Sequence, residues 1–170
     1  RKGVVKKTNL SQFSNPRKGG IIAINIDKGD ELIGVKLTSG KDDVVLATRE
    51  GMSIRFPEAQ VKEQGRATRG VKGITLDKKD DVVSLDIVEK DATLLVVTEN
   101  GYGKRTDFDE YRIQNRGGKG IITMKTTDKT GLVIGVNRVV DADEIMMISA
   151  QGKMVRTPVK DVRVIGRNTQ

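Results

Sequence analysis

Short apolar runs alternate with polar turns along the whole chain. Each run is rich in β-branched residues and is bounded by glycine, aspartate, asparagine or lysine. The runs are Ile21–Ile24, Leu32–Val35, Val44–Ala47, Val82–Leu85, Leu94–Val97, Ile121–Met124, Leu132–Val136 and Ile145–Ile148. No stretch keeps the apolar spacing of a helix over a full helix length, so the pattern predicts an all-β fold. Asn100-Gly101 predicts a tight hairpin, and Pro57 to Gln64 predicts a short turn of helix.

A glycine-led motif recurs about every fifty residues. Its leading glycines are 48, 50 and 51 residues apart, at Gly3, Gly51, Gly101 and Gly152. A base stands four positions after each glycine, at Lys7, Arg55, Arg105 and Arg156. A period of this length is typical of solenoids, propellers and arrays.

The strand content favours propeller-type blades among these repeat architectures, since each period holds about four predicted strands. A pair of unrelated β-barrels is the alternative. We expect one domain over residues 1–170, with repeats at approximately 1–50, 51–100, 101–150 and 151–170. The partial repeats at both ends predict an incomplete ring and a piece of a longer protein.

Positive and negative charge are segregated within each repeat. The glycine-led halves carry 22 Lys/Arg against 6 Asp/Glu, whereas the intervening halves carry 9 against 17. If every repeat folds alike, the basic halves lie along one side or rim and the acidic halves face away from it. A long positive track favours a nucleic-acid partner. The few aromatic residues favour duplex over single strand, because single-strand binders rely on aromatic stacking.

The composition also excludes several kinds of chemistry. The chain has no cysteine and no histidine, which removes disulfides, thiolate metal sites and the commonest general base. Tyr102 and Tyr111 have no acid–base cluster around them, so we expect both to be packing or rim residues. Acid pairs such as Asp42-Asp43 and Asp80-Asp81 could hold Mg²⁺. Their recurrence just before a strand favours turn chemistry instead, and we expect neither a metal site nor a catalytic residue.

The densest motif is a glycine-rich basic loop, Gln114-Asn115-Arg116-Gly117-Gly118-Lys119-Gly120. Its glycines let the backbone approach another surface, and free N–H groups with two cations suit a phosphate. Related segments are found at Asn15–Ile21, Arg66–Ile74 and Ile165–Gln170. The alternative for each is a tight loop between blades with solvated bases. No Gly-Lys-Ser/Thr occurs, which excludes a nucleotide P-loop.

These motifs, together with Asp30–Gly40, Asn100–Thr106 and Val164–Gln170, resemble the C-terminal domain of the bacterial DNA gyrase A subunit. The similarity covers essentially the whole chain. It implies a β-pinwheel, a propeller-like ring whose blades exchange strands, with duplex DNA wrapped around a basic rim. It also implies a bacterial cytoplasmic location and the rest of gyrase A and gyrase B as partners. The holoenzyme would use ATP and Mg²⁺ for negative supercoiling, whereas this domain would hold no cofactor.

Two departures from the family pattern shape the expectations. Asn115 replaces the second base of the family's Gln-Arg/Lys-Arg-Gly-Gly-Arg/Lys-Gly box, and the box-like loop lies in a later repeat than the functional box. We therefore expect a box-like interblade loop that behaves like other rim segments. The C-terminal domain of the topoisomerase IV subunit and a protein-interaction propeller are the alternative functions.

The candidate phosphate contacts are bases of the glycine-led halves. They are Lys6, Lys7, Arg17, Lys18, Arg55, Arg66, Arg69, Lys72, Lys104, Arg105, Arg116, Lys119, Arg156 and Arg167. We expect them to contact phosphates along the rim with little base readout, because cations that track a backbone carry little sequence information.

Overall fold

The computed structural model describes residues 1–169, and within them every regular element is a β-strand or a short 3-10 turn. The strands are β1 (Val4–Val5), β2 (Asp43–Thr48), β3 (Met52–Pro57), β4 (Val71–Lys72), β5 (Val82–Ile87), β6 (Thr93–Thr98), β7 (Gly103–Asp107), β8 (Ile121–Ile122), β9 (Val133–Val139), β10 (Glu144–Ile148) and β11 (Met154–Pro158). The turns are η1 (Leu10–Phe13), η2 (Glu58–Gln60), η3 (Phe108–Glu110) and η4 (Val159–Asp161). The all-β prediction is confirmed, and the helical turn expected after Pro57 is the single turn η2. Among the described residues, no helix has the length and apolar character needed to cross a membrane.

Each blade is built on an antiparallel hairpin: β2–β3, β6–β7 or β10–β11. The turn of the second hairpin contains Asn100 and Gly101, as predicted. A strand that follows the hairpin returns to its other edge, so that β5 pairs with β2 and β9 pairs with β6. A further short strand reaches back from the next repeat, since β8 adds to β3 and β4 adds to β1. The sheets are therefore completed by strand exchange along the chain.

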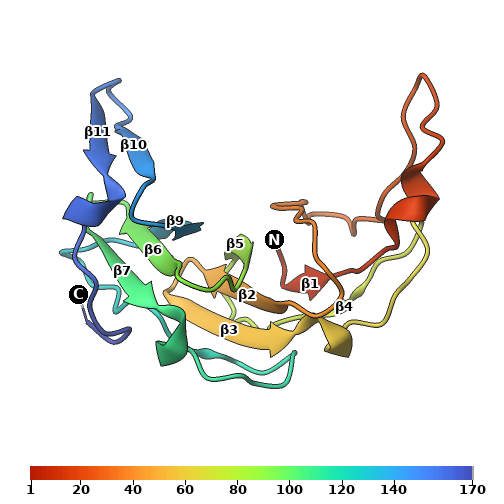
Figure 1. Ribbon diagram of the computed structural model, residues 1–170, viewed down its shortest axis with the longest axis horizontal. Coiled ribbons are helices and arrows are strands. Elements are labelled where there is room, and N and C mark those ends of the chain that lie inside the picture. The colour runs from red at the N-terminus through yellow and green to blue at the C-terminus, as the bar shows by residue number, and fades with distance from the viewer. Residues whose placement is uncertain (170) are drawn as a thin grey trace.

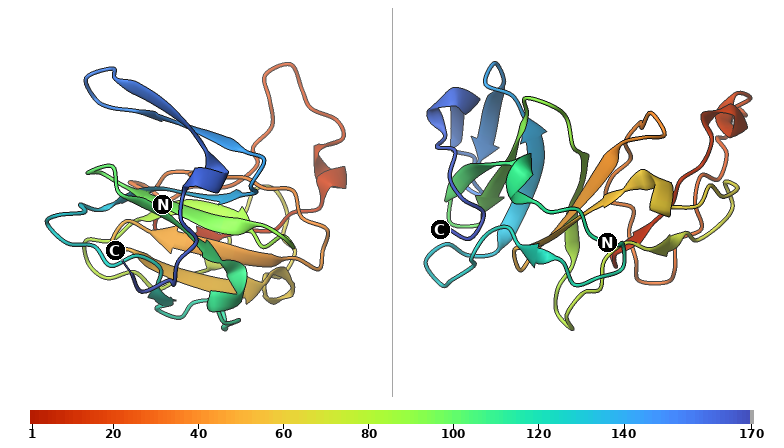
Figure 2. Two further views of the ribbon diagram at one scale, coloured as in Figure 1. Left: turned by 60° about the vertical axis from the view of Figure 1, so that its left-hand side comes forward. Right: turned by 60° about the horizontal axis from the view of Figure 1, so that its bottom comes forward.

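The blades follow one another around an open arc (Figure 1). The sheets stay separate, with strand orders β5-β2-β3-β8 and β7-β6-β9 beside the pairs β1-β4 and β10-β11. The β10–β11 hairpin projects from the body of the molecule in every view (Figures 1 and 2). An unclosed propeller-like arrangement is the fold that the repeats predicted.

The central strands are buried on both faces, which explains why their sequences are continuous apolar runs rather than alternating ones. In β2, Val45 and Ala47 pack in one hydrophobic cluster, while Leu46 between them packs in a second. In β6, Leu94 joins the first cluster and Leu95 joins a third. Successive side chains of a strand point to opposite faces, so each central strand bridges two cores.

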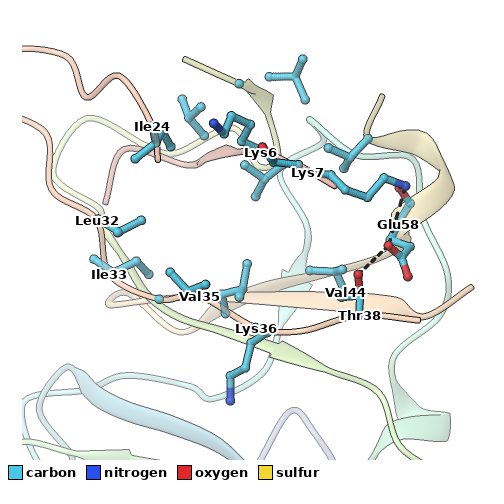
Figure 3. A pocket seen from close by; sticks show the side chains of 18 of the residues that line it. Lys6, Lys7, Ile24, Leu32, Ile33, Val35, Lys36, Thr38, Val44 and Glu58 are labelled. Carbon is cyan, nitrogen blue, oxygen red and sulfur yellow. Dashed lines mark hydrogen bonds and ion pairs between the residues drawn. The ribbon is translucent and has the colours of Figure 1, made fainter. Parts of the chain in front are cut away.

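Two predicted strands are not formed, Ile21–Ile24 and Leu32–Val35. The second run matches the position of β9, which is hydrogen-bonded to β6. No strand lies between Leu32–Leu37 and β1 in the part of the chain that the structure describes. A groove of about 730 Å³ separates them instead, with Leu32, Ile33 and Val35 on one wall and Lys6 and Lys7 on the other (Figure 3). Without a hydrogen-bonding neighbour, the apolar run alone does not make a strand.

Burial at equivalent positions measures the difference between this groove and a complete blade. Val35 is 75% exposed, whereas Val136, at the matching position of β9 and paired with Val96 of β6, is 3% exposed. The two valines occupy the same position of the repeat, but only Val136 lies in a segment that is paired with a neighbouring strand.

Candidate nucleic-acid interface

The recurring base of the glycine-led motif links one blade to the next in three of the four repeats. Arg105 is 4% exposed. Its Nε donates to the Val162 carbonyl at 2.9 Å, and its Nη1 binds an Asp141 carboxylate oxygen at 2.5 Å. Val162 directly follows η4, so the guanidinium ties β7 to the next turn along the arc.

Arg55 and Lys7 make the equivalent connections. The Nη1 of Arg55 donates to the Phe108 and Tyr111 carbonyls at 2.9 and 3.3 Å, at the two ends of η3. The Nζ of Lys7 donates to the Glu58 carbonyl of η2 at 3.0 Å. The Glu58 and Phe108 carbonyls each also accept a hydrogen bond within the turn, from the Val61 and Tyr111 amides, so these bases add a second donor to them. Lys7, Arg55 and Arg105 are called the latch bases below.

The candidate list needs correction at the latch bases, because their donors are committed to carbonyls and carboxylates inside the protein. Arg156, the fourth member of the series, differs. Its side chain is 67% exposed and pairs with Glu144 across its own hairpin. The same position of the repeat thus links two blades in three repeats and forms an exposed ion pair in the fourth.

Two lysines of the candidate list donate hydrogen bonds to backbone carbonyls of the basic loops. Lys104 is 1% exposed. Its Nζ donates to the carbonyls of Gly166, Arg167 and Thr169 at 3.0, 2.6 and 3.0 Å. Lys6 makes the same kind of contact with carbonyls that include Gly65. Burial, and then the charge of Arg167, lower the pKa of Lys104 to about 8. The Lys104 ammonium is therefore not presented to solvent as a phosphate ligand, whereas Lys6 is partly exposed with its ammonium engaged by these carbonyls.

The lowered pKa of Lys104 predicts an alkaline stability window. The unfolded lysine binds its proton up to about pH 10.4, whereas the folded one releases it near pH 8. Between these values the unfolded state binds more protons, so the free energy of unfolding should rise with pH. Thermal unfolding from pH 7.5 to 10.5 should show this rise in the wild type and lose it in Lys104→Met. An identical pH profile for both proteins would contradict the assignment.

The arginine of the box-like loop also serves the fold. The Nε of Arg116 donates to the Gln60 carbonyl, and its Nη1 donates to the Lys72 carbonyl, both at 2.9 Å. The equivalent residues repeat the second contact: Arg66 with the Ile22 carbonyl and Arg167 with the Ile122 carbonyl. These three arginines tie each loop to a strand or strand-like segment beside it.

The backbone of the box-like loop is largely used inside the protein. Gly120 has φ +82°, and a Cβ on it would lie 2.2 Å from the Ser53 carbonyl oxygen. The Gly117 amide donates to the Gly73 carbonyl at 2.6 Å, and the Arg116 amide donates to Gln60 Oε1 at 2.9 Å. The glycines therefore allow close packing between blades, and these two amides are not free for a phosphate. Lys119 remains exposed and pairs with Asp77 at 3.3 Å.

The expected separation of acidic and basic faces is not observed. Bases of the glycine-led halves form ion pairs with acids of the intervening halves. These pairs are Arg55–Asp43, Arg69–Asp27, Arg105–Asp141, Lys119–Asp77 and Arg156–Glu144. Strand pairing brings the two halves side by side, so much of the charge pattern stabilises the fold locally.

Glu58 has a structural role that no sequence motif predicted. Its carboxylate is buried and accepts hydrogen bonds from the Gly40 amide at 2.8 Å, the Asp42 amide at 3.0 Å and the Thr38 hydroxyl at 2.8 Å. Burial alone would raise the pKa of Glu58, but these bonds and the charge of Lys7 hold it below its usual range. The sequence feature that could have indicated this role is the position of Glu58 directly after Pro57, at the start of η2.

The acid pairs before the strands act in turns. Asp42 accepts from the Ser39 amide at 2.7 Å, and Asp80 accepts from the Glu50 amide at 2.9 Å. Asp143 accepts from the Val140 amide at 2.9 Å. Among residues 1–169, no three acidic side chains gather in an arrangement that could hold a metal ion.

Of the candidate bases, the exposed ones are Arg17, Lys18, Arg69, Lys72, Lys119 and Arg156. They lie in the loops and hairpins of successive blades rather than in one cluster. The chemistry they offer is a dispersed set of cations, suited to a long polyanion and not to a small ligand.

The comparisons with known proteins agree on one family. The profile described as "DNA gyrase C-terminal domain, beta-propeller" matches residues 1–39, 42–89, 92–139 and 143–170. The DNA gyrase A subunit of Salmonella typhimurium is 51% identical over 168 residues, which are 99% of this chain and 19% of that protein. The subunit of Escherichia coli K12 is 49% identical over the same coverage. The chain spans about a fifth of the length of these relatives.

Solved structures show the same fold. The C-terminal domain of DNA topoisomerase IV superposes with a TM-score of 0.93 at 27% identity, covering 100% of this chain and 54% of that one. The DNA gyrase A C-terminal domain superposes with a TM-score of 0.87 at 28% identity, covering 99% and 56%. The profile match over all four repeats, the identity of about one half and the strand-exchanged blades lead to one conclusion: the chain belongs to the family of DNA gyrase C-terminal domains.

Proposed function

We propose that this chain is a non-catalytic module of a gyrase A subunit that binds and wraps duplex DNA. In the complete enzyme it would support ATP-dependent negative supercoiling, together with the rest of gyrase A and gyrase B. The observation that carries the proposal is the 51% identity to a DNA gyrase A subunit over 99% of the chain. The exposed cations on successive blades support it, because a duplex presents phosphates at regular intervals along its length.

Wrapping requires many weak contacts acting together. Bending a short duplex site by 40–90° costs on the order of 1–6 kcal/mol. No single exposed lysine offsets that, since surface charges are screened by salt. Blades of the same design are arranged around an arc (Figure 1), so the cations on successive blades would follow a curved path. The curvature of the fold would thereby set the curvature of the bound DNA.

A role in topoisomerase IV is the second candidate, and it is favoured by the TM-score of 0.93. The sequence favours gyrase, because the gyrase A subunits of Salmonella typhimurium and Escherichia coli K12 are 51% and 49% identical to the chain over 99% of its length. The two solved domains do not separate the candidates by identity, at 27% for topoisomerase IV and 28% for gyrase A.

The test is a topology assay. A closed plasmid is relaxed by topoisomerase I in the presence of increasing amounts of the chain, and the linking number is read after deproteinisation. Wrapping in a positive sense should shift the topoisomer distribution toward positive linking-number differences. A single-stranded competitor should release little protein from the plasmid. An unchanged distribution, together with no salt-dependent duplex binding, would point to a protein-interaction module instead.

A further inference from the structure

A second series of bases recurs at the junctions between blades, and the candidate list did not include it. Lys62, Arg112 and Arg163 each stand two residues after the end of a 3-10 turn, η2, η3 and η4 respectively. They are 50 and 51 residues apart. These three residues are called the junction row below.

The local fold turns each of these side chains outward. The residue before each base packs inward: Val61 and Tyr111 are buried, and Val162 is partly buried. Neighbouring residues in extended backbone point to opposite sides, so the bases point away from the core. All three are exposed, and among the described residues none of their side chains forms an ion pair or hydrogen bond.

The same backbone contact fixes all three positions. The residue directly after each base forms a parallel β-bridge with a latch base, in the pairs Lys7–Glu63, Arg55–Ile113 and Arg105–Val164. These bridges are held by equivalent hydrogen bonds at 2.9, 2.8 and 2.9 Å, from the amides of Gln64, Gln114 and Ile165 to the latch-base carbonyls. Identical junctions place the bases at identical points, so the row advances by one blade at each step. The turns that precede them follow one another around the convex side of the arc (Figure 1).

We propose that the junction row contacts phosphates of duplex DNA, while the latch bases beneath it hold the blades together. This inference rests on the proposed function, since it names residues through which the chain would bind a duplex. A series of unpaired cations at equal steps matches a partner whose charge repeats uniformly. Exposed acids on η3, Asp109 and Glu110, lie close to Arg112 in sequence. We therefore expect Arg112 to contribute least of the three.

The experiment compares two variants that lose the same charge. The first is Lys62→Ala/Arg112→Ala/Arg163→Ala. The second is Lys41→Ala/Lys90→Ala/Lys153→Ala, which removes three exposed bases from turns away from the junctions. Affinity for duplexes of several sequences is measured over a range of salt concentrations, and thermal unfolding checks the fold. Exposed substitutions of this kind change stability by no more than about 0.5 kcal/mol.

The salt dependence decides the outcome. Each phosphate contact adds about −0.9 to the slope of log K against log salt, so the junction variant should flatten the slope by about 1.8–2.7 for every duplex alike, the lower value applying where Arg112 makes no contact. The control variant should keep the wild-type slope. Equal slopes in the two variants, with a wild type that binds duplex, would overturn the junction row and leave the proposed function standing. A wild type that binds no duplex would overturn both.

Discussion

Replacing Arg105 by alanine is expected to lower the free energy of unfolding by about 2–4 kcal/mol. The substitution leaves the Val162 carbonyl without its donor and removes the buried stem of the side chain from the junction of β7 with η4. Urea denaturation monitored by circular dichroism measures the loss. The slope of log K against log salt for duplex binding should not change, because the Arg105 guanidinium is already engaged within the protein.

Arg156→Ala is the matched control, since it removes the same side chain from the same position of the repeat. Its ion pair with Glu144 is exposed, and such pairs contribute at most about 1 kcal/mol. Equal destabilisation by the two substitutions would contradict the role of Arg105 as a latch base that links two blades. So would an Arg105→Ala protein of wild-type stability whose salt slope is flattened by about one contact.

Val136→Asp is expected to destabilise the fold by more than about 3 kcal/mol, because a carboxylate would be buried without a partner in the hydrophobic cluster that contains Val136. Val136 is cross-strand from Val96, in the cluster that joins two blades. If Val136→Asp fails to accumulate as folded protein, Val136→Ala should still show a loss of about 1–3 kcal/mol. Chemical denaturation gives both values.

Val35→Asp should change stability by no more than about 0.5 kcal/mol, although Val35 occupies the matching position of its repeat. The side chain lies open to solvent in the groove beside β1 (Figure 3). A large loss at Val35 would show that the groove is closed in solution. A small loss at Val136 would show that β9 does not depend on β6 for its burial.

Much of the fold follows from local sequence. Val44–Ala47, Leu94–Val97 and Ile145–Ile148 became β2, β6 and β10. In β2 and β6 the continuous apolar run suits a strand that is buried on both faces, whereas the residues of β10 are exposed or only partly buried. Asn100-Gly101 predicted its hairpin because Gly101 adopts φ +79°, which glycine reaches without steric cost. The family resemblance rested on the same local motifs, and the profile match confirmed it.

The site was less predictable, because charge in the sequence does not reveal burial. Lys104 and Arg105 read as rim cations, yet they lie in the middle of β7 and satisfy carbonyls of a neighbouring blade. A signal was available at the junction row, where a base directly follows an inward-packing residue in each repeat. Lys62, Arg112 and Arg163 lie beyond the glycine-led motifs, so the recurrence of those motifs did not predict them.

The sequence by itself determined the elements and their period, since strand formation, turn type and repeat length depend on residues close together in the chain. The tertiary structure decided which residues at the same position of the repeat also have the same structural role. Leu32–Leu37 and β9 have similar sequences, but only β9 has a neighbouring strand to complete its hydrogen bonds. Arg105 and Arg156 share one position of the repeat, but only Arg105 faces carbonyls that need a donor. Strand formation in the first pair and burial of the guanidinium in the second depend on partners from distant segments of the chain. A local sequence pattern does not reveal those partners.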